Sequence, residues 1–138
     1  MTYGHAMNWP LVYVLFPGTA RAALTYYARV FGGELNLHDY AEMSRTDGPA
    51  DAVAHGTLDG PVSLAGADAA AGEPAVSVQG VMLSLLGTDA ERLRGWYAAL
   101  ADGGEEIDAL ARRPWGDWDG QVRDRFGLTW LVGFPHSE

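Results

Sequence analysis

The sequence predicts an α+β fold of two tandem βαβββ modules, which form a curled, mixed eight-stranded sheet with the helices outside. Residues 18–35 (GTARAALTYYARVFGGEL) and 87–107 (GTDAERLRGWYAALADGGEEI) share an opening Gly-Thr, a central tyrosine and a closing Gly-Gly-Glu. The two closing segments lie 71 positions apart, about half of the 138 residues, which indicates an internal duplication. An apolar run also precedes each copy, as a strand before each helix requires.

The first module is expected over residues 9–67. Its first strand, 9–16, ends at Pro17-Gly18, and Thr19 is the expected N-cap of the helix. Small and apolar residues then recur with helical period: Ala20, Ala23, Leu24, Tyr27 and Phe31. Gly32-Gly33 end the helix. The remaining strands are predicted at 34–43, 52–59 and 61–67, the last two joined by the hairpin signal Asp59-Gly60.

The second module is expected over residues 80–134, after a flexible linker at 68–79 that is rich in small residues. Its first strand is 80–87, and Asp89 is the expected cap of a helix with Leu93, Trp96, Tyr97 and Leu100 on its buried face. A strand is predicted at 105–111. The loop at 111–121 leads into the next strand, and the last strand is predicted at 128–134. Trp130 is expected in the core. The two modules together are expected to make one domain.

Composition excludes several classes of protein. The chain has no cysteine, so it has neither a disulfide framework nor a thiolate nucleophile. Nine basic residues against 18 acidic ones give a net charge of −9, which disfavours nucleic acid and suits neutral or cationic partners. No apolar run approaches the roughly 20 residues of a membrane span, and no signal-peptide pattern opens the chain. We therefore expect a cytoplasmic protein with no membrane or nucleic-acid partner.

Five ordered segments resemble the vicinal oxygen chelate superfamily, which includes glyoxalase I, extradiol dioxygenases and bleomycin resistance proteins. They are ALTYY through FGGE (23–34), AHGTL (54–58), WG (115–116), GQVRD (120–124) and FGLTW (126–130). The residues in these segments resemble those of the PhnB-like branch, whose members are often labelled demethylubiquinone methyltransferase-like. The resemblance covers roughly residues 9–134. It implies the two-module fold, whereas this superfamily hosts many different reactions.

The resemblance also implies where metal ligands belong, on the first and fourth strand of each module. The matching positions are Leu11 or Val12, Ser63 or Ala65, Met82, and Leu131. None of these side chains is a ligand for zinc or for a hard divalent cation. We therefore predict a cup without a metal and without any other cofactor.

His55 is the candidate catalytic residue, because it lies within a predicted core strand and histidine titrates near neutrality. It can serve as an acid, a base or a hydrogen-bond donor in the cup. The alternative is a structural histidine bonded to a backbone carbonyl, or an exposed one. No carboxylate that would orient it stands nearby in the sequence. The resemblance to the PhnB-like branch, in which a histidine recurs on this strand, favours a functional role.

Two tryptophans flank Gly116-Asp117 in the predicted loop. Trp115 and Trp118 are interpreted either as a lid over the cup or a dimer contact, or as side chains packed on the rim of their own module. The candidate ligand-binding residues are Tyr13, His55, Thr57, Met82, Ser84, Trp115, Trp118 and Leu131. Arg112-Arg113 can grip a carboxylate or phosphate, but a solvated pair is the commoner arrangement.

Two functions of different classes remain open. The first is a protein that binds a small organic molecule, neutral or cationic, in a metal-free cup. The second is a small-metabolite enzyme, a lyase, isomerase or dioxygenase type, that uses a metal or takes His55 as its general base. The sequence does not decide whether the protein is an enzyme. A homodimer is expected, because exposed sheet edges are a liability that pairing removes and five tryptophans suggest more apolar surface than one small domain hides. The resemblance to the superfamily implies that the two modules of a cup can come from one chain or from two, so exchanged and side-by-side modules both stay open.

Overall fold

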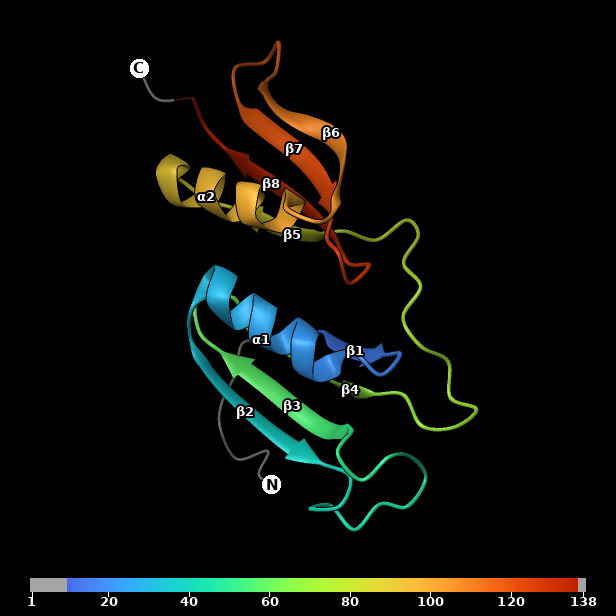
Figure 1. The fold of residues 1–138 in the computed structure, drawn as a ribbon. Helices are drawn as coiled ribbons and strands as arrows, with labels where there is room; N and C mark the ends of the chain where they lie inside the picture. The colour runs from blue at the N-terminus through green and yellow to red at the C-terminus, as the bar shows by residue number, and fades with distance from the viewer. Residues whose placement is uncertain (1–9, 137–138) are drawn as a thin grey trace. The chain divides into compact units, whose positions relative to one another are not determined.

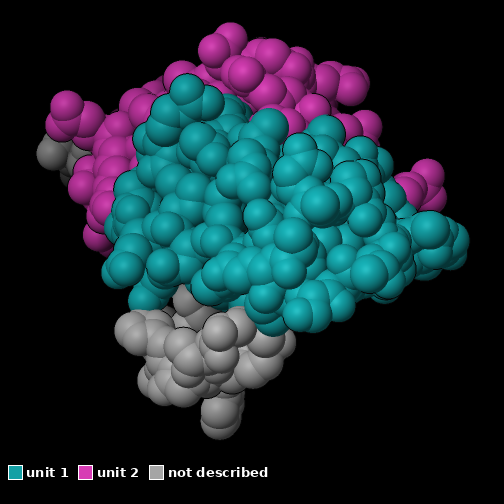
Figure 2. Space-filling view, turned by 60° about the horizontal axis from the view of Figure 1, so that its bottom comes forward, with its two compact units in different colours: residues 1–76 teal, residues 77–138 magenta. Residues whose placement is uncertain are grey.

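The computed structural model describes residues 10–136, and in them two helices and eight strands follow the order β-α-β-β-β twice. Contacts divide the chain after Val76 into unit 1 (residues 1–76) and unit 2 (residues 77–138), coloured separately in Figure 2. The predicted α+β class with two tandem βαβββ modules is confirmed. The described strands form two four-stranded sheets, one in each unit.

Unit 1 contains β1 (Tyr13–Phe16), α1 (Ala20–Phe31), β2 (Glu34–Asp39), β3 (Val53–Asp59) and β4 (Leu64–Asp68). Sheet 1 has the strand order β1-β4-β3-β2, with β1 parallel to β4 and the other pairs antiparallel (Figure 1). The helix covers one face of this sheet and buries the five residues that its periodicity predicted.

Unit 2 contains β5 (Leu83–Leu86), α2 (Ala90–Ala101), β6 (Glu105–Arg112), β7 (Trp118–Arg123) and β8 (Thr129–Phe134). Sheet 2 repeats the topology as β5-β8-β7-β6, again with one parallel pair (Figure 1). On α2, Leu93, Tyr97 and Leu100 are buried as predicted, whereas Trp96 is half-buried. Asp89 caps this helix by accepting a hydrogen bond of 3.1 Å from the Arg92 backbone N–H.

The Gly-Gly-Glu repeats occupy equivalent places in the two sheets. Glu34 begins β2 and lies opposite Asp59 on β3, and Glu105 begins β6 and lies opposite Arg123 on β7. Gly32 and Gly103, at the two helix ends, both have positive φ angles, 78° and 75°. The repeat therefore places a glycine with positive φ between helix and strand in each unit.

Several predicted strand boundaries are wrong, because a local sequence pattern does not reveal which residues find hydrogen-bond partners on a neighbouring strand. Four strands are shorter than predicted by two or more residues: β1 begins at Tyr13, β2 ends at Asp39, β4 begins at Leu64, and β5 runs only from Leu83 to Leu86. Residue 9, the predicted start of the first strand, lies outside the described residues. The predicted loop at 111–121 is shorter, because β6 continues to Arg112 and β7 already begins at Trp118.

Thr19 stands at the N-cap of α1, but its side chain makes no capping hydrogen bond. The buried carboxylate of Asp68, at the end of β4, takes that role. Its Oδ1 accepts from the Ala20 backbone N–H at 2.8 Å, and its Oδ2 accepts from the Val53 N–H at 2.9 Å. Asp68 thus ties the helix start, β3 and β4 together, a contact between residues 48 positions apart.

The segment after β4 is fastened to unit 1 rather than loose. The Ala69 N–H donates to the Phe16 carbonyl at 2.8 Å, and the Val76 N–H donates to the Leu15 carbonyl at 2.7 Å. Both acceptors lie on β1. Residues 69–76 therefore belong with the first sheet, and the stretch between the units starts after Val76.

Candidate functional site

The candidate site of unit 1 lies on the face of sheet 1 that is turned away from α1, here called the distal face of sheet 1. A Cβ added to Gly56 would meet the side chains of Leu24 on α1 and Leu37, so Gly56 points to the helix. Because strand residues alternate, His55 and Thr57 point to the distal face. Strand register then places Tyr13, Ala65, Thr57 and Asn36 in one row across the sheet.

Tyr13 and His55 meet on this face although β4 separates their strands. The Tyr13 hydroxyl lies 3.0 Å from His55 Nδ1, and the two rings stack with centroids 5.6 Å apart. Between them β4 presents Ala65 and Ala67, whose small side chains leave room for this contact. Tyr13 is 47 % exposed and His55 only 6 %, so the pair joins a buried imidazole to an accessible phenol.

The environment of His55 disfavours its charged form. Burial lowers the pKa of His55 below its usual value near 6.5, and a positive charge on His38, whenever that ring is protonated, lowers it further. His55 is therefore neutral at neutral pH, with one ring nitrogen that donates and one that accepts. A neutral imidazole beside a phenol can hydrogen-bond a ligand or accept a proton from it.

Sequence reasoning missed a second histidine on the same face. His38 on β2 lies directly opposite His55 on β3. Its Nδ1 lies 3.1 Å from Oε1 of Glu42, four residues further along the chain. The i to i+4 spacing is visible in the sequence, but the turn that makes it a contact is not.

In unit 2, strand register brings together two of the predicted binding residues. Ser84 on β5 pairs with Leu131 on β8, which pairs with Gln121 on β7, and Gln121 pairs with Asp108 on β6. This row corresponds strand for strand to the row that starts at Tyr13 in unit 1. Met82 lies just before β5 and is 41 % exposed. Ser84 and Leu131 thus lie side by side on neighbouring strands of sheet 2, and Met82 lies just before the first of them.

Trp118 does not share that face. It pairs with Phe134, their rings stack with centroids 6.2 Å apart, and the guanidinium of Arg94 on α2 lies over both rings. Its ring therefore faces the helix, and the rim-packing alternative describes it. Trp115 lies in the turn between β6 and β7 and is 69 % exposed.

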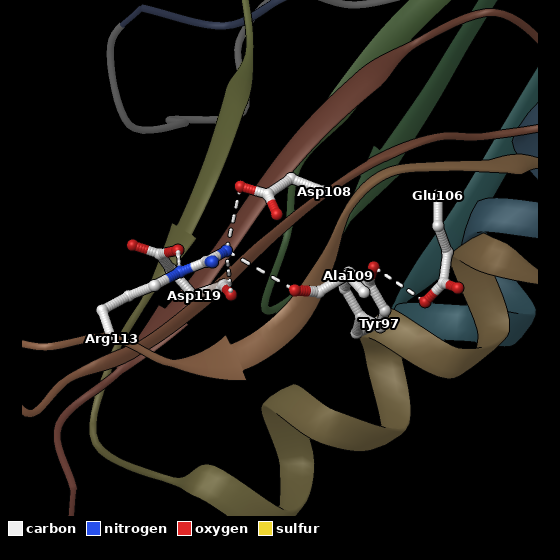
Figure 3. Close-up of polar contacts among 6 residues, drawn as sticks. All are labelled: Tyr97, Glu106, Asp108, Ala109, Arg113 and Asp119. Atoms are coloured by element: carbon white, nitrogen blue, oxygen red, sulfur yellow. Dashed lines mark hydrogen bonds and ion pairs between the residues drawn. The ribbon is translucent and has the colours of Figure 1, made fainter.

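Arg113 is engaged by its own hairpin rather than by solvent (Figure 3). Its Nε donates to Asp119 Oδ1 at 2.6 Å, and its Nη2 lies 3.0 Å from Asp108 Oδ2 and 3.1 Å from the Asp119 carbonyl. The solvated pair expected at Arg112-Arg113 is wrong for Arg113. Since two carboxylates already neutralise this guanidinium, it is a poor site for an anionic ligand.

The positions at which the resemblance implies metal ligands do not fit a metal. Ala65 and Leu131, in the centres of their rows, have no donor atoms, and the thioether of Met82 is a soft, weak donor. Within residues 10–136, no group of three or more His, Cys, Asp or Glu side chains is placed to hold a metal ion. No step is therefore assigned to a metal here.

The arrangement of strands and the sequence decide the family together. The profile of the Glyoxalase/Bleomycin resistance protein/Dioxygenase superfamily matches residues 4–132. The chain belongs to this superfamily. Protein YjdN of Escherichia coli is 28 % identical over 137 residues, which cover 87 % of this chain and 90 % of YjdN.

Solved structures share the fold of this chain. Protein PA1353 from Pseudomonas aeruginosa is similar with a TM-score of 0.79 and 25 % identity, covering 95 % of this chain and all of that one. A PhnB protein from Bacillus cereus has a TM-score of 0.73 at 17 % identity, covering 94 % of this chain and all of that one. The resemblance to the superfamily, with PhnB-like structural neighbours, is thus confirmed. No helix among the described residues is long and apolar enough to cross a membrane.

Proposed function

We propose that this superfamily member binds a small organic molecule, neutral or cationic, on the distal face of sheet 1. The observation that carries the proposal is the Tyr13–His55 pair, an accessible phenol held against a buried, neutral imidazole. Aromatic faces supply contact area for an organic ligand, and the hydroxyl and imidazole fix its orientation.

The charge of this face supports the ligand class. The four strands β1–β4 contain no arginine or lysine, and the whole chain carries a net charge of −9. An anionic ligand would have no fixed positive partner on these strands, whereas a cation would be attracted by the acidic chain. The side chains at the positions where the superfamily is expected to hold its metal lack suitable donor atoms, which supports binding of the molecule without a metal.

The test is calorimetric titration of the purified protein with a panel of three compounds of different charge. They are bleomycin, a neutral aromatic compound and an aromatic carboxylate. We expect the carboxylate to bind weakest. Tyr13→Ala should weaken binding of the best probe about tenfold or more, because both the ring and the hydroxyl are lost. Tyr13→Phe keeps the ring and should weaken it about three- to tenfold, the usual worth of one hydrogen bond. Equal affinity of both variants and the parent would contradict the site.

The second candidate is an enzyme that uses His55 as general base, and the lowered pKa of His55 favours it. A neutral histidine is competent to accept a proton at neutral pH. Breakdown of lactoylglutathione is a suitable first assay, because a lactoylglutathione lyase from Agrobacterium tumefaciens shares the fold at 20 % identity and a TM-score of 0.52. Its chain is matched over 96 % of its length, against 94 % of this one. Turnover that is lost in His55→Gln would favour the enzyme over simple binding.

A further inference from the structure

The two histidines on the distal face of sheet 1 have different partners. His38 is held by a carboxylate, with Nδ1 3.1 Å from Glu42 Oε1, and 28 % of its side chain is exposed. His55 is held by a phenol and is buried. A carboxylate accepts hydrogen bonds only, so the His38 nitrogen that faces Glu42 carries a proton, and in the neutral ring Nε2 is the acceptor.

The backbone fixes the position of Glu42. β2 ends in a bulge between His38 and Asp39, and the chain then turns. The Asp39 side chain accepts a hydrogen bond of 2.7 Å from the Glu42 backbone N–H, and the Asp39 carbonyl accepts one of 3.1 Å from the Met43 N–H. This turn brings the Glu42 carboxylate back to the histidine at the strand end. The pair is therefore built by the turn rather than met by chance between two mobile side chains.

We propose that His38, oriented by Glu42, is the proton-accepting group of this face, and that His55 stays neutral and hydrogen-bonds the ligand together with Tyr13. The proposal rests on the function proposed above and narrows its ligand to a neutral, protic molecule with a weakly acidic N–H or O–H. A histidine oriented by a carboxylate through Nδ1–H is the arrangement that general bases use.

The groups around His55 support this division of roles. From β1 it faces Tyr13, and from β2 it faces His38, with Glu42 behind that ring. β4 places no charged side chain on this face, because Asp68 alternates with Ala67 and points to the α1 side, where it accepts from the N–H groups of Ala20 and Val53. Burial, and a positive charge on His38, both lower the pKa of His55. A proton taken up by His38 therefore discourages a second one on His55.

The proton transfer balances within the site. The ligand X–H gives its proton to Nε2 of neutral His38 and keeps the bonding pair as X⁻. His38 becomes an imidazolium whose Nδ1–H donates to the Glu42 carboxylate, so ligand and histidine form an ion pair with no change in total charge. His55 and Tyr13 supply hydrogen bonds and do not change their protonation states in this step.

Nitrogen NMR of the histidine rings tests the division of roles on the ligand-free protein, from about pH 8 to about pH 5. We expect His38 in the Nδ1–H tautomer and expect His55 to be the later of the two to become protonated. Glu42→Gln should weaken the tautomer preference of His38. His38→Gln should raise the pH at which His55 is protonated. Glu91→Gln on α2 is the matched control and should leave both rings unchanged. Protonation of His55 before His38, or an Nε2–H tautomer at His38, would overturn the proposal.

A coloured phenol tests the transfer itself. 4-Nitrophenol ionises near neutral pH, and its phenolate is yellow. The ionised fraction of 4-nitrophenol should be higher when it is bound to the parent protein than in buffer. When it is bound to His38→Gln, the ionised fraction should be several-fold lower than with the parent. Equal ionisation in both proteins would overturn the proton-accepting role. Absence of any binding by the panel and by 4-nitrophenol would count against the proposed function, while the ring tautomers would still decide the roles of the two histidines.

Discussion

At the residue scale, Tyr97 offers a pH-dependent contribution to stability. Its hydroxyl donates a hydrogen bond of 2.9 Å to the Glu106 carboxylate (Figure 3). Burial first, and then this bond, raise the pKa of Tyr97 to about 12, against a value near 10 in an unfolded chain. The folded protein thus holds the phenol proton more tightly. This contribution to the free energy of unfolding is complete below about pH 10 and is lost as the pH rises through about 12.

We therefore expect the free energy of unfolding to fall less steeply with pH in Tyr97→Phe than in the parent, between about pH 10 and about pH 12. Urea unfolding at a series of pH values measures this slope. Some decline should remain in the variant, because burial also raises the pKa of Tyr40. Glu106→Gln keeps an acceptor but removes the charge, so phenolate absorbance should appear at lower pH. Identical slopes in parent and Tyr97→Phe would refute the assignment.

Residues also show where prediction from sequence stops. His55 and Tyr13 were found because each stands in a strand pattern, but their contact depends on the alanines that β4 places between them. The oriented histidine proved to be His38, and its link to His55 is a matter of strand register. Register is a property of two strands together, which a reading of either strand alone does not contain.

At the scale of elements, the Gly-Gly-Glu repeat makes a sharp prediction. Gly33 has a φ of 114°, and a Cβ there would lie 2.7 Å from the Asp59 carbonyl oxygen. A Cβ at Gly104 would collide with the Arg123 carbonyl oxygen. Gly33→Ala and Gly104→Ala should each cost about 2–4 kcal/mol of stability, because the backbone must move at the start of β2 or β6.

Gly95 is the matched control for these two substitutions. It lies within α2, and a Cβ there would meet no atom within 4 Å. Gly95→Ala should therefore stabilise the protein by about 0.5–1 kcal/mol through helix propensity. Thermal or urea unfolding of the three variants gives the comparison. No cost at Gly33 and Gly104 would show that the repeat does not mark a tight approach of backbones.

Helices were easier to predict than strand ends for a physical reason. The apolar faces of α1 and α2 are local, repeating patterns, and Asp89 caps α2 from the adjacent position. The start of α1 depends instead on Asp68, 48 residues later, which no local pattern reveals. The loop predicted at 111–121 failed because β6 and β7 pair far into it, as far as Arg112 opposite Trp118.

At the scale of the whole molecule, the stretch that connects the two units is shorter than the predicted linker. Hydrogen bonds to β1 hold the chain as far as Val76, and β5 begins at Leu83. The remaining stretch, 77–82, would span roughly 13 Å root-mean-square if flexible. An exchange of modules between two chains, which the sequence leaves open beside a side-by-side arrangement, would have to use this short stretch.

We expect the protein to form a homodimer. Each four-stranded sheet has two edge strands, and edges with unpaired backbone groups are a liability that association removes. Trp115, 69 % exposed, is the remaining aromatic candidate for the contact, because Trp118 packs within unit 2. Light scattering in moderate salt should give a mass close to twice the chain mass of 14.8 kDa at tens of micromolar.

Substitution of the exposed tryptophan locates the contact. Trp115→Ala should weaken the dimer by about tenfold or more in dissociation constant, since buried tryptophans are frequent hot spots of interfaces. Leu86→Ala, at another exposed apolar side chain of unit 2, is the control for loss of surface area alone. If both variants remain dimers of equal strength, the contact lies elsewhere and Trp115 becomes available to a ligand. A stable mass near 15 kDa for the parent would refute the dimer itself, and the acidic chain would then be kept monomeric by its own charge.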